Sequence, residues 1–390
     1  MNKYIKIEPK VMEYAWGNKD FIPTLINKEI DGNPKAELWM GTHSGAPSLI
    51  EGSDKTLEDY LKEHVCFFSS EHVQKFNDNL PFLFKILAIE KPLSIQCHPN
   101  YKEAKIGYDN EKEYRENNPR SLWNYKDDNR KAEVIFALTD ITAMCSFLSD
   151  EEILTNLKTY IPKGFDKYIS SKFIDNKSKA EVVFDYLYKV DKEILKELIT
   201  ELLENVKNCE NKKGSFFTKE GIINRVKDEY PLDSGLFAPL FLNVVHLKKN
   251  EALYLEPRLL HAYVYGNGIE LMSASDNVLR GGLTNKKMDV DELMKVMRIS
   301  QDKIELCNTR RDKYNREIVE TPTEEFTLLY FDKGDYQVKT KNLEMLLFLD
   351  DSVLTIDKKD VEIKKGDVYV ICANTIYSLK NKGQVFVATC

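Results

Sequence analysis

The chain has 390 residues and a formal net charge of −7, and 42% of its residues are hydrophobic. This length exceeds what one hydrophobic core usually serves, so we expect two or three domains. The negative charge argues against nucleic acid or an anionic membrane as a partner. No stretch reaches the roughly 20 apolar residues that a membrane-spanning helix requires.

The N-terminus and the cysteines indicate the compartment. The first ten residues, MNKYIKIEPK, carry charges where a secretory signal peptide has an apolar core, so we expect a cytoplasmic protein. The seven cysteines are odd in number and irregularly spaced, and they form no CxxC pair. This pattern predicts free thiols rather than a disulfide framework.

Residues 1–150 are expected to form mostly strands and turns. Phe82–Ile89 has the apolar pattern of a strand, and Leu93–His98 forms a second extended run after a turn. Because successive side chains of a strand point to opposite faces, the polar and apolar residues of the second run separate. Ser94, Gln96 and His98 share one face, and Leu93, Ile95 and Cys97 share the other. A polar inner face is costly unless something binds to it, so we interpret it as half of a metal site.

The pattern changes to helices over residues 149–232. The tetrapeptides 149–152 and 178–181 both have the sequence Ser-x-x-Glu, which is the spacing of a capping box. Apolar residues recur at helical spacing over 194–206, and 216–230 has the pattern of a last helix, ended by the following proline. This block contains no histidine. We therefore expect it to be structural or a lid, and not to carry a metal.

Strand patterns return after residue 240. The runs 241–248, 251–255 and 261–265 follow one another closely, and a short helical pattern at 289–298 comes after them. From residue 325 to the C-terminus, short β-runs alternate with turns, which is typical of a small sandwich or barrel. No histidine follows His261, so this last part has no imidazole ligand of its own.

The run that begins at His261 contains Asn267-Gly268, the strongest short signal for a hairpin turn. If these two residues form the loop, Tyr265 pairs with Glu270. Since cross-strand partners point to the same face, His261, Tyr263 and Glu270 would then project to one side. The hairpin hypothesis thus adds a carboxylate to the polar interior.

Four residues stand out as potential metal ligands: Gln96, His98, Glu133 and His261. Glu133 lies in a predicted strand over 130–136, in which Lys131 shares its face. Two histidines and one carboxylate suit a borderline divalent ion such as Zn²⁺, and a glutamine amide oxygen is a harder fourth ligand. Spacing alone leaves open that each histidine is a hydrogen-bonded core residue. We adopt that interpretation for the remaining histidines, which are His43, His64, His72 and His246.

Basic side chains accompany these strands in the sequence. Lys85, Lys131, Arg280 and Lys286 are each compatible with a solvated surface, which is the usual place of lysine. Their proximity in sequence to the polar strand faces favours, as the alternative, a site for a phosphate group.

Several segments of the chain match those of a known family. They are Tyr14–Gly17, ELWMGTH at 37–43, LPFLFKILAIEKPLSIQCHPN at 80–100, NYKDDNRKAEVIFAL at 124–138 and HAYVYGNGIELMSASDNVLRGGLTNK at 261–286. With these motifs the chain closely resembles the type I mannose-6-phosphate isomerases. The resemblance covers nearly all of the catalytic part, whereas the helical block matches in position only.

The resemblance implies a mainly β fold, with two cupin-type jelly-roll domains and an inserted α-helical domain. Together with the shifts in pattern described above, it predicts three domains. These are a catalytic metal-binding cupin domain at 1–148 and 233–322, a helical insertion at 149–232 and a C-terminal jelly roll at 323–390. The resemblance also implies one zinc ion per chain, with Gln96, His98, Glu133 and His261 as its ligands.

The activity implied is the interconversion of mannose 6-phosphate and fructose 6-phosphate through a cis-enediol. The expected partner is therefore a small phosphorylated sugar, and the sequence does not predict an oligomeric state. The family's substrate contacts fall on Lys85, Ser94, Lys131 and Arg280, with Lys286 close by. Two candidates remain open as the base that moves the proton between C1 and C2, Glu270 and Lys131. In a third alternative, Glu270 only orients Arg280 or a sugar hydroxyl.

The chain departs from the family pattern at Arg130, Leu260 and Asn285. The family usually has histidine at the first of these positions, with a proposed role in ring opening, and proline at the other two. Two other protein classes remain as alternatives. An iron-dependent oxygenase of the cupin type would use two histidines and one carboxylate. A sugar-binding bicupin would bind the sugar phosphate without exchanging its hydrogen with solvent.

Overall fold

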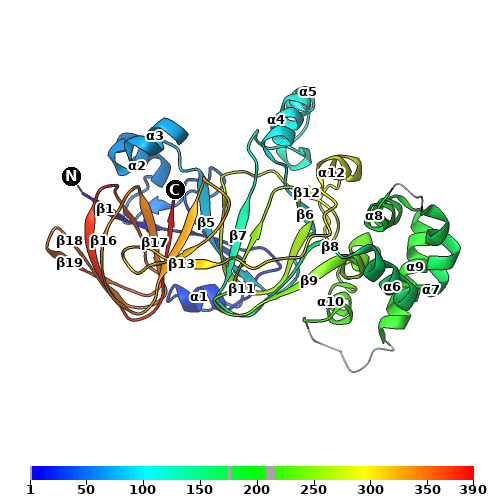
Figure 1. The fold of residues 1–390 in the computed structure, drawn as a ribbon. Helices are drawn as coiled ribbons and strands as arrows, with labels where there is room; N and C mark the ends of the chain where they lie inside the picture. The colour runs from blue at the N-terminus through cyan, green and yellow to red at the C-terminus, as the bar shows by residue number, and fades with distance from the viewer. Residues whose placement is uncertain (1, 174–176, 208–215) are drawn as a thin grey trace.

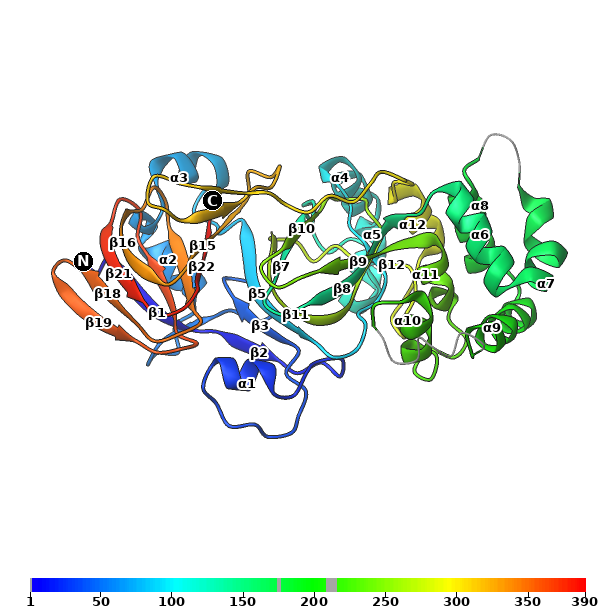
Figure 2. The same ribbon diagram turned by 60° about the horizontal axis from the view of Figure 1, so that its bottom comes forward.

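The computed structural model describes residues 2–173, 177–207 and 216–390. Within them the chain forms two regions of antiparallel strands and a block of helices (Figure 1). The helices lie at one end of the molecule, the C-terminal strands lie at the other, and a ten-stranded sheet lies between them (Figure 2). The expected architecture, mainly β with a helical insertion, is confirmed at this level. Among the described residues, no helix has both the length and the apolar character needed to cross a membrane.

The ten-stranded sheet carries the predicted site. Its main path has the order β10-β7-β11-β5-β3-β2, and β6, β8, β9 and β12 branch from it. β11 pairs with β5, β6, β7 and β8, so it joins the main path to the branches. The strands are β2 (Lys10–Met12), β3 (Glu37–Met40), β5 (Phe82–Ile89), β6 (Gln96–Cys97), β7 (Glu133–Ala137), β8 (Ile141–Phe147), β9 (Leu242–Leu247), β10 (Ala252–Leu255), β11 (His261–Ser273) and β12 (Leu279–Arg280).

The predicted hairpin at Asn267-Gly268 is wrong, because β11 is one continuous strand of 13 residues. Asn267 pairs with Ala88 of β5, and Gly268 pairs with strands on both of its sides. A Cβ at Gly268 would lie 2.8 Å from Phe136 O. Glycine is therefore required here for close packing between strands and not for a turn.

A bulge in β11 produces the side-chain arrangement that the hairpin was expected to produce. The register against β8 shifts between Tyr263 and Tyr265, which leaves Val264 as an extra residue. One inserted residue reverses the face that all later side chains occupy. Glu270 therefore lines the same interior as His261, although the chain does not turn between them.

Gly266 is held in a special conformation beside this bulge, with φ at +111°, and a Cβ there would lie 2.3 Å from Asp140 O. Gly266→Ala is expected to lower the free energy of unfolding by about 2 kcal/mol or more, because it adds backbone strain and a clash with the main chain. Gly32→Ala is the matched control, since Gly32 has φ at +78° but no atom within 4 Å. Chemical denaturation measures both variants. Equal losses would show that the approach to Asp140 is not the reason for glycine.

The helical insertion begins where the sequence predicts. Ser149 and Glu152 form a reciprocal capping box at the start of α6, and the Ser178 side chain caps α8. The last predicted helix, over 216–230, is shorter than expected, because α10 covers only Lys219–Val226. The other helices of the block are α6 (Asp150–Tyr160), α7 (Pro162–Gly164), α8 (Lys179–Lys189), α9 (Lys192–Lys207) and α11 (Ala238–Phe241). Their apolar faces share one core with the side chains of β11 that point away from the site, so the block is anchored on the sheet.

The first 150 residues contain more helix than expected. α4 is the clearest case, because Asn100 and Glu103 form a capping box at its start. The prediction missed this signal, in which asparagine stands in the place of serine. The helices outside the insertion are α1 (Phe21–Leu25), α2 (Leu57–Glu63), α3 (Ser70–Phe76), α4 (Tyr101–Asn110), α5 (Lys112–Asn117) and α12 (Val290–Val296).

The C-terminal strands form an eight-stranded and a four-stranded sheet around one core. β1 and β14 belong to the larger of these sheets, through pairing with β20 and β15. The segments 4–8 and 309–319 are predicted to belong to the catalytic domain. Their strands instead lie in the eight-stranded sheet of the C-terminal region. The strands are β1 (Tyr4–Glu8), β4 (Leu49–Ile50), β13 (Thr309–Arg311), β14 (Glu317–Val319), β15 (Thr327–Phe331), β16 (Gly334–Lys339), β17 (Glu344–Phe348), β18 (Ser352–Ile356), β19 (Lys359–Ile363), β20 (Val368–Ile371), β21 (Ile376–Asn381) and β22 (Val385–Thr389).

The cysteines agree with the expectation from their spacing. Every cysteine among the described residues is a free thiol, and Cys209 lies outside those residues. Cys97 and Cys145 are buried, and burial raises the pKa of the Cys145 thiol to about 12. These two thiols therefore serve as apolar packing groups.

Candidate active site

A buried polar cavity lies inside the ten-stranded sheet. Side chains from β3, β5, β6, β7 and β11 enclose about 70 Å³, which is room for a metal ion and a few oxygen atoms. The polar side chains that line it are Glu37, Lys85, Ser94, Gln96, Lys131, Glu133, His261, Tyr263 and Glu270. The structure thus brings together the residues that strand alternation assigned to one polar interior.

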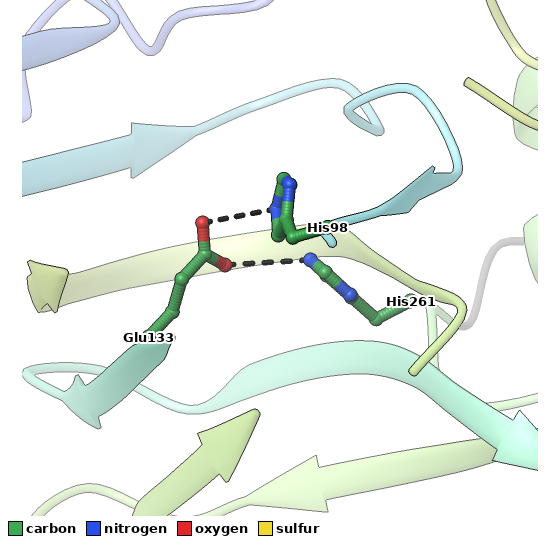
Figure 3. Close-up of side chains that lie close together, drawn as sticks. All are labelled: His98, Glu133 and His261. Carbon is green, nitrogen blue, oxygen red and sulfur yellow. Dashed lines mark ion pairs between the residues drawn. The ribbon is translucent and has the colours of Figure 1, made fainter. Parts of the chain in front are cut away.

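His98, Glu133 and His261 converge beside this cavity, with the carboxylate of Glu133 between the two imidazole rings (Figure 3). His98 Nε2 lies 3.2 Å from Glu133 Oε1, and His261 Nε2 lies 3.3 Å from Glu133 Oε2. One donor atom of each residue lies within 4.8 Å of the other two. Three buried donors this close together suit a single divalent ion.

Strand pairing positions these three side chains. His261 opens β11 and pairs directly with Gln96 of β6, and β6 leads into His98. Glu133 opens β7 and pairs with Met272 near the other end of β11. The donors therefore come from three segments that are far apart in sequence and meet on β11.

Each histidine presents Nε2 to the site because its Nδ1 is used elsewhere. His98 Nδ1 lies 2.7 Å from Asn277 O, and His261 Nδ1 lies 2.9 Å from Leu259 O. A ring that donates through Nδ1 to a carbonyl has a free lone pair on Nε2 when it is neutral. Burial and the nearby Lys131 lower the pKa of His98 to about 4, so this ring is neutral at pH 7. Neutral imidazole is the form that binds metal ions.

Gln96 and Tyr263 add two more polar groups beside His98, Glu133 and His261. Gln96 donates its amide Nε2 to Ser94 Oγ at 3.2 Å, and its amide oxygen accepts no hydrogen bond among the described residues. The Tyr263 hydroxyl is buried and makes no hydrogen bond of good geometry within the described part of the chain, although burial and the nearby Glu133 raise its pKa well above the usual value. A buried hydroxyl without a partner costs free energy, so its presence here fits a site in which a bound group supplies the partner.

Two ion pairs lie inside the cavity. Lys131 Nζ is 2.8 Å from Glu133 Oε1, and Lys85 Nζ is 3.0 Å from Glu270 Oε2. Burial alone would raise the pKa of Glu133, but Lys131 and His98 hold it well below its usual range. Burial would likewise lower the pKa of Lys85, but Glu270 and then Glu37 raise it above its usual value. Both lysines therefore already have carboxylate partners, and Lys85 keeps its charge.

Glu270 has the chemistry of a proton acceptor. Burial raises its pKa above the usual value for glutamate, in opposition to Lys85, which lowers it. A carboxylate whose pKa moves toward neutrality is a stronger base than an ordinary one. Glu270 makes no contact with Arg280 among the described residues, so the alternative in which it orients Arg280 is not supported. Lys131, the rival base, is held by Glu133 at 2.8 Å.

Arg280 and Lys286 differ from the two lysines inside the cavity. Arg280 pairs with Gln96 between β12 and β6, so it lies directly beside the donor set. Among the described residues, neither Arg280 nor Lys286 forms an ion pair. Burial lowers the pKa of Arg280, and burial together with Arg280 lowers the pKa of Lys286. These two cations are neighbours without an ion-pair partner among the described residues, although Glu37 opposes the lowering of the Lys286 pKa.

Sequence reasoning missed Glu37 and Asn277 as parts of the site. Glu37 Oε2 lies 3.9 Å from Lys85 Nζ. Glu37 and Trp39 are two residues apart on β3, so they share a face, and Trp39 pairs with Lys85 of β5. This shared face was the signal that could have identified Glu37. Asn277 has no such signal, because it lies in a loop and reaches His98 through its backbone oxygen.

The residue that departs from the family pattern, Arg130, does not line the cavity. Its Nε lies 3.1 Å from Glu325 Oε2, and one terminal nitrogen lies 2.9 Å from Thr323 Oγ1. Arg130 thus ties the start of the C-terminal region to the strand that carries Glu133. The four histidines expected to be structural also lie outside the cavity: His43, His64, His72 and His246.

The chain matches two family models. Residues 4–149 match the catalytic domain of type I phosphomannose isomerase, and residues 155–242 match the helical insertion domain of the same family. The second match corresponds to the block between the strands of the ten-stranded sheet.

Individual proteins agree with these models. The chain is 32% identical to the mannose-6-phosphate isomerase of Escherichia coli strain K12, over 95% of both chains. It is 30% identical to the human mannose-6-phosphate isomerase, over 95% of this chain and 93% of the human one. A crystal structure of mannose 6-phosphate isomerase bound with zinc and yttrium superposes with a TM-score of 0.87 at 29% identity and covers 99% of both chains. From the two matching domains and from relatives similar over almost their whole length, the chain belongs to the type I phosphomannose isomerase family.

Proposed function

We propose that the protein is an aldose–ketose isomerase that interconverts mannose 6-phosphate and fructose 6-phosphate through a cis-enediol. The observation that carries this proposal is a buried cluster of two histidines and a glutamate beside a second buried glutamate, Glu270, in a member of this family. The reaction moves one proton between C1 and C2. It therefore needs a base, an electrophile at the two oxygens and an anchor for the phosphate.

We propose that the metal is zinc, one ion per chain, with Gln96, His98, Glu133 and His261 as ligands. The donor chemistry supports this choice, since two imidazoles, a carboxylate and an amide oxygen suit a borderline ion. When bound, zinc supplies a Lewis acid for the oxygens at C1 and C2. The chain's own part is to keep His98 neutral and Glu133 ionised, to present Nε2 of both histidines, and to exclude water by burial.

The proton step follows from the ion pairs. Glu270 is the proposed base, because burial raises its pKa, and Lys85, which opposes this shift, fixes its orientation at 3.0 Å. Lys131 remains with Glu133, and we assign it to holding substrate oxygens. The Ser94 hydroxyl and the Tyr263 hydroxyl are further donors available to the sugar.

We propose that the domains follow the family plan, with cupin-type jelly rolls at 1–148 with 233–322 and at 323–390, and a helical insertion at 149–232. The antiparallel sheets and the buried donor cluster inside one of them support this division. The strand at 4–8 completes the C-terminal sheet, so the first and last domains share a layer.

Arg280 and Lys286 are proposed to bind the phosphate group. Arg280→Ala is expected to raise the KM for mannose 6-phosphate about 10- to 100-fold, because charge-assisted hydrogen bonds to a phosphate are strong. Turnover of free mannose, measured at high concentration in a coupled assay, should be low in the wild type and little changed in the variant. Arg298→Ala is the matched control, since Arg298 is exposed and pairs with Glu256. An equal loss on both sugars would assign Arg280 a structural role instead.

A further inference from the structure

One further cation, Lys126, lies near the cavity. Lys126 lies in the loop between α5 and β7, and its backbone binds Asn277, which lies three residues before Arg280 in the chain. Its ammonium group donates to the Trp123 carbonyl and has no carboxylate partner among the described residues. Arg280, with its neighbours Lys126 and Lys286, thus forms a group of cations without an ion-pair partner among the described residues, in a protein whose net charge is −7.

The position of this loop is tied to the metal cluster through one residue. The Lys126 backbone N–H donates to Asn277 Oδ1 at 2.6 Å, and the Asn277 backbone oxygen lies 2.7 Å from His98 Nδ1. Asn277 is fully buried, and its amide nitrogen also donates to Asp127 O at 2.8 Å. Lys126 is therefore held at a fixed place relative to the metal cluster, as a group that orients a substrate must be.

The electrostatic cost of this arrangement indicates a ligand. Burial, followed by the nearby Arg280 and Arg120, lowers the pKa of Lys126 to about 8. Glu111 opposes the shift, and Lys287 adds to it. The cost of bringing these cations together is offset when a dianion lies between them.

We propose that Lys126 is a third cation of the phosphate site and contacts the substrate phosphate together with Arg280 and Lys286. Its effect is on specificity, because a half-buried ammonium without a carboxylate partner favours a doubly charged terminal group over a hydroxyl. This inference rests on the proposed function, in which the substrate is a sugar phosphate.

A pH dependence follows. In the free protein Lys126 loses its proton as the pH rises through about 8, and only the charged form binds the phosphate. The kcat/KM for mannose 6-phosphate should therefore fall above this pH, while kcat at saturating substrate stays level. The substrate phosphate has its second pKa near 6, so it is already a dianion in this range and does not cause the fall.

Three variants test the inference. Lys126→Met should raise the KM about 10-fold or more and remove the fall in kcat/KM at alkaline pH. Lys126→Arg keeps a charge at all these pH values, so it should retain most of the affinity and also lose the alkaline fall. Lys287→Met is the matched control, because Lys287 lies nearby and its ammonium likewise donates to a carbonyl, that of Leu122 at 2.9 Å, but among the described residues its backbone is not held by Asn277. It should change the KM less than about 2-fold.

Calorimetric titration with inorganic phosphate provides a readout that does not depend on turnover. The wild type should bind phosphate more tightly than Lys126→Met, and Lys287→Met should match the wild type. Equal binding in the wild type and Lys126→Met, or an alkaline fall that persists in both Lys126 variants, would overturn the role of Lys126. If the wild type bound phosphate through Lys126 but turned over no sugar phosphate, the proposed function would fail and this inference would stand.

Discussion

His261→Ala is expected to remove the bound metal and to lower turnover by about 10⁴-fold or more, the loss that follows when a catalytic Lewis acid is removed. The variant removes one of the three converging donors. It also removes the imidazole that lies 3.3 Å from the Glu133 carboxylate. Elemental analysis of the purified wild type and the variant measures the metal directly, and a coupled assay measures turnover.

The matched control for this prediction is His246→Ala. His246 is exposed on β9 and lies outside the cavity, so both metal content and turnover should match the wild type. Equal metal content in His261→Ala and the wild type would refute the assignment of His261 as a ligand. Iron in place of zinc, with uptake of oxygen, would favour the oxygenase alternative.

Glu270→Gln should reduce turnover by about 10²- to 10⁴-fold, the usual contribution of a general base, while metal content is retained. The substitution keeps the shape of the side chain and its contact with Lys85 but removes the acceptor of the proton. Exchange of the C2 hydrogen of mannose 6-phosphate with D₂O should fall together with turnover. In the wild type, kcat/KM should rise with pH through the raised pKa of Glu270, because only the ionised form accepts a proton. The variant should lose this rise.

Glu37→Gln separates proton transfer from charge balance, since Glu37 also lies near Lys85, at 3.9 Å. If Glu270 only balanced the charge of Lys85, the two variants would lose similar activity. The account predicts a much smaller loss in Glu37→Gln. Exchange at a rate close to wild type in Glu270→Gln would exclude Glu270 as the base, and Lys131→Met would then be the variant to make.

Strand alternation carried most of what could be predicted about the site. Phe82–Ile89 forms the expected strand, and Ser94 and Gln96 line the cavity while Ile95 and Cys97 are buried in the core. The period of two is a local property of the backbone, so it can be obtained from sequence. Lys131 and Glu133 share a face for the same reason and form an ion pair at 2.8 Å.

The errors come from features that only the assembled sheet determines. Asn267-Gly268 has strong local preference for a turn, but pairing with β5 and β7 on both sides outweighs it. The bulge at Val264 places Glu270 correctly for a reason that no short motif indicates. No short motif indicates the role of Asn277 either, because it acts through its backbone oxygen. The pairing of Tyr4–Glu8 is equally hidden, because its partner β20 lies more than 350 residues along the chain.

The most direct test of the account is isomerisation by the purified protein with and without its metal. Mannose 6-phosphate is converted in a coupled assay that detects fructose 6-phosphate, first with the protein as purified, then after chelation and dialysis, and then after addition of zinc. The account predicts formation of fructose 6-phosphate, its loss on chelation and its recovery with zinc. Binding of mannose 6-phosphate without formation of fructose 6-phosphate in the zinc-loaded protein would contradict it, and would indicate a sugar-binding protein instead.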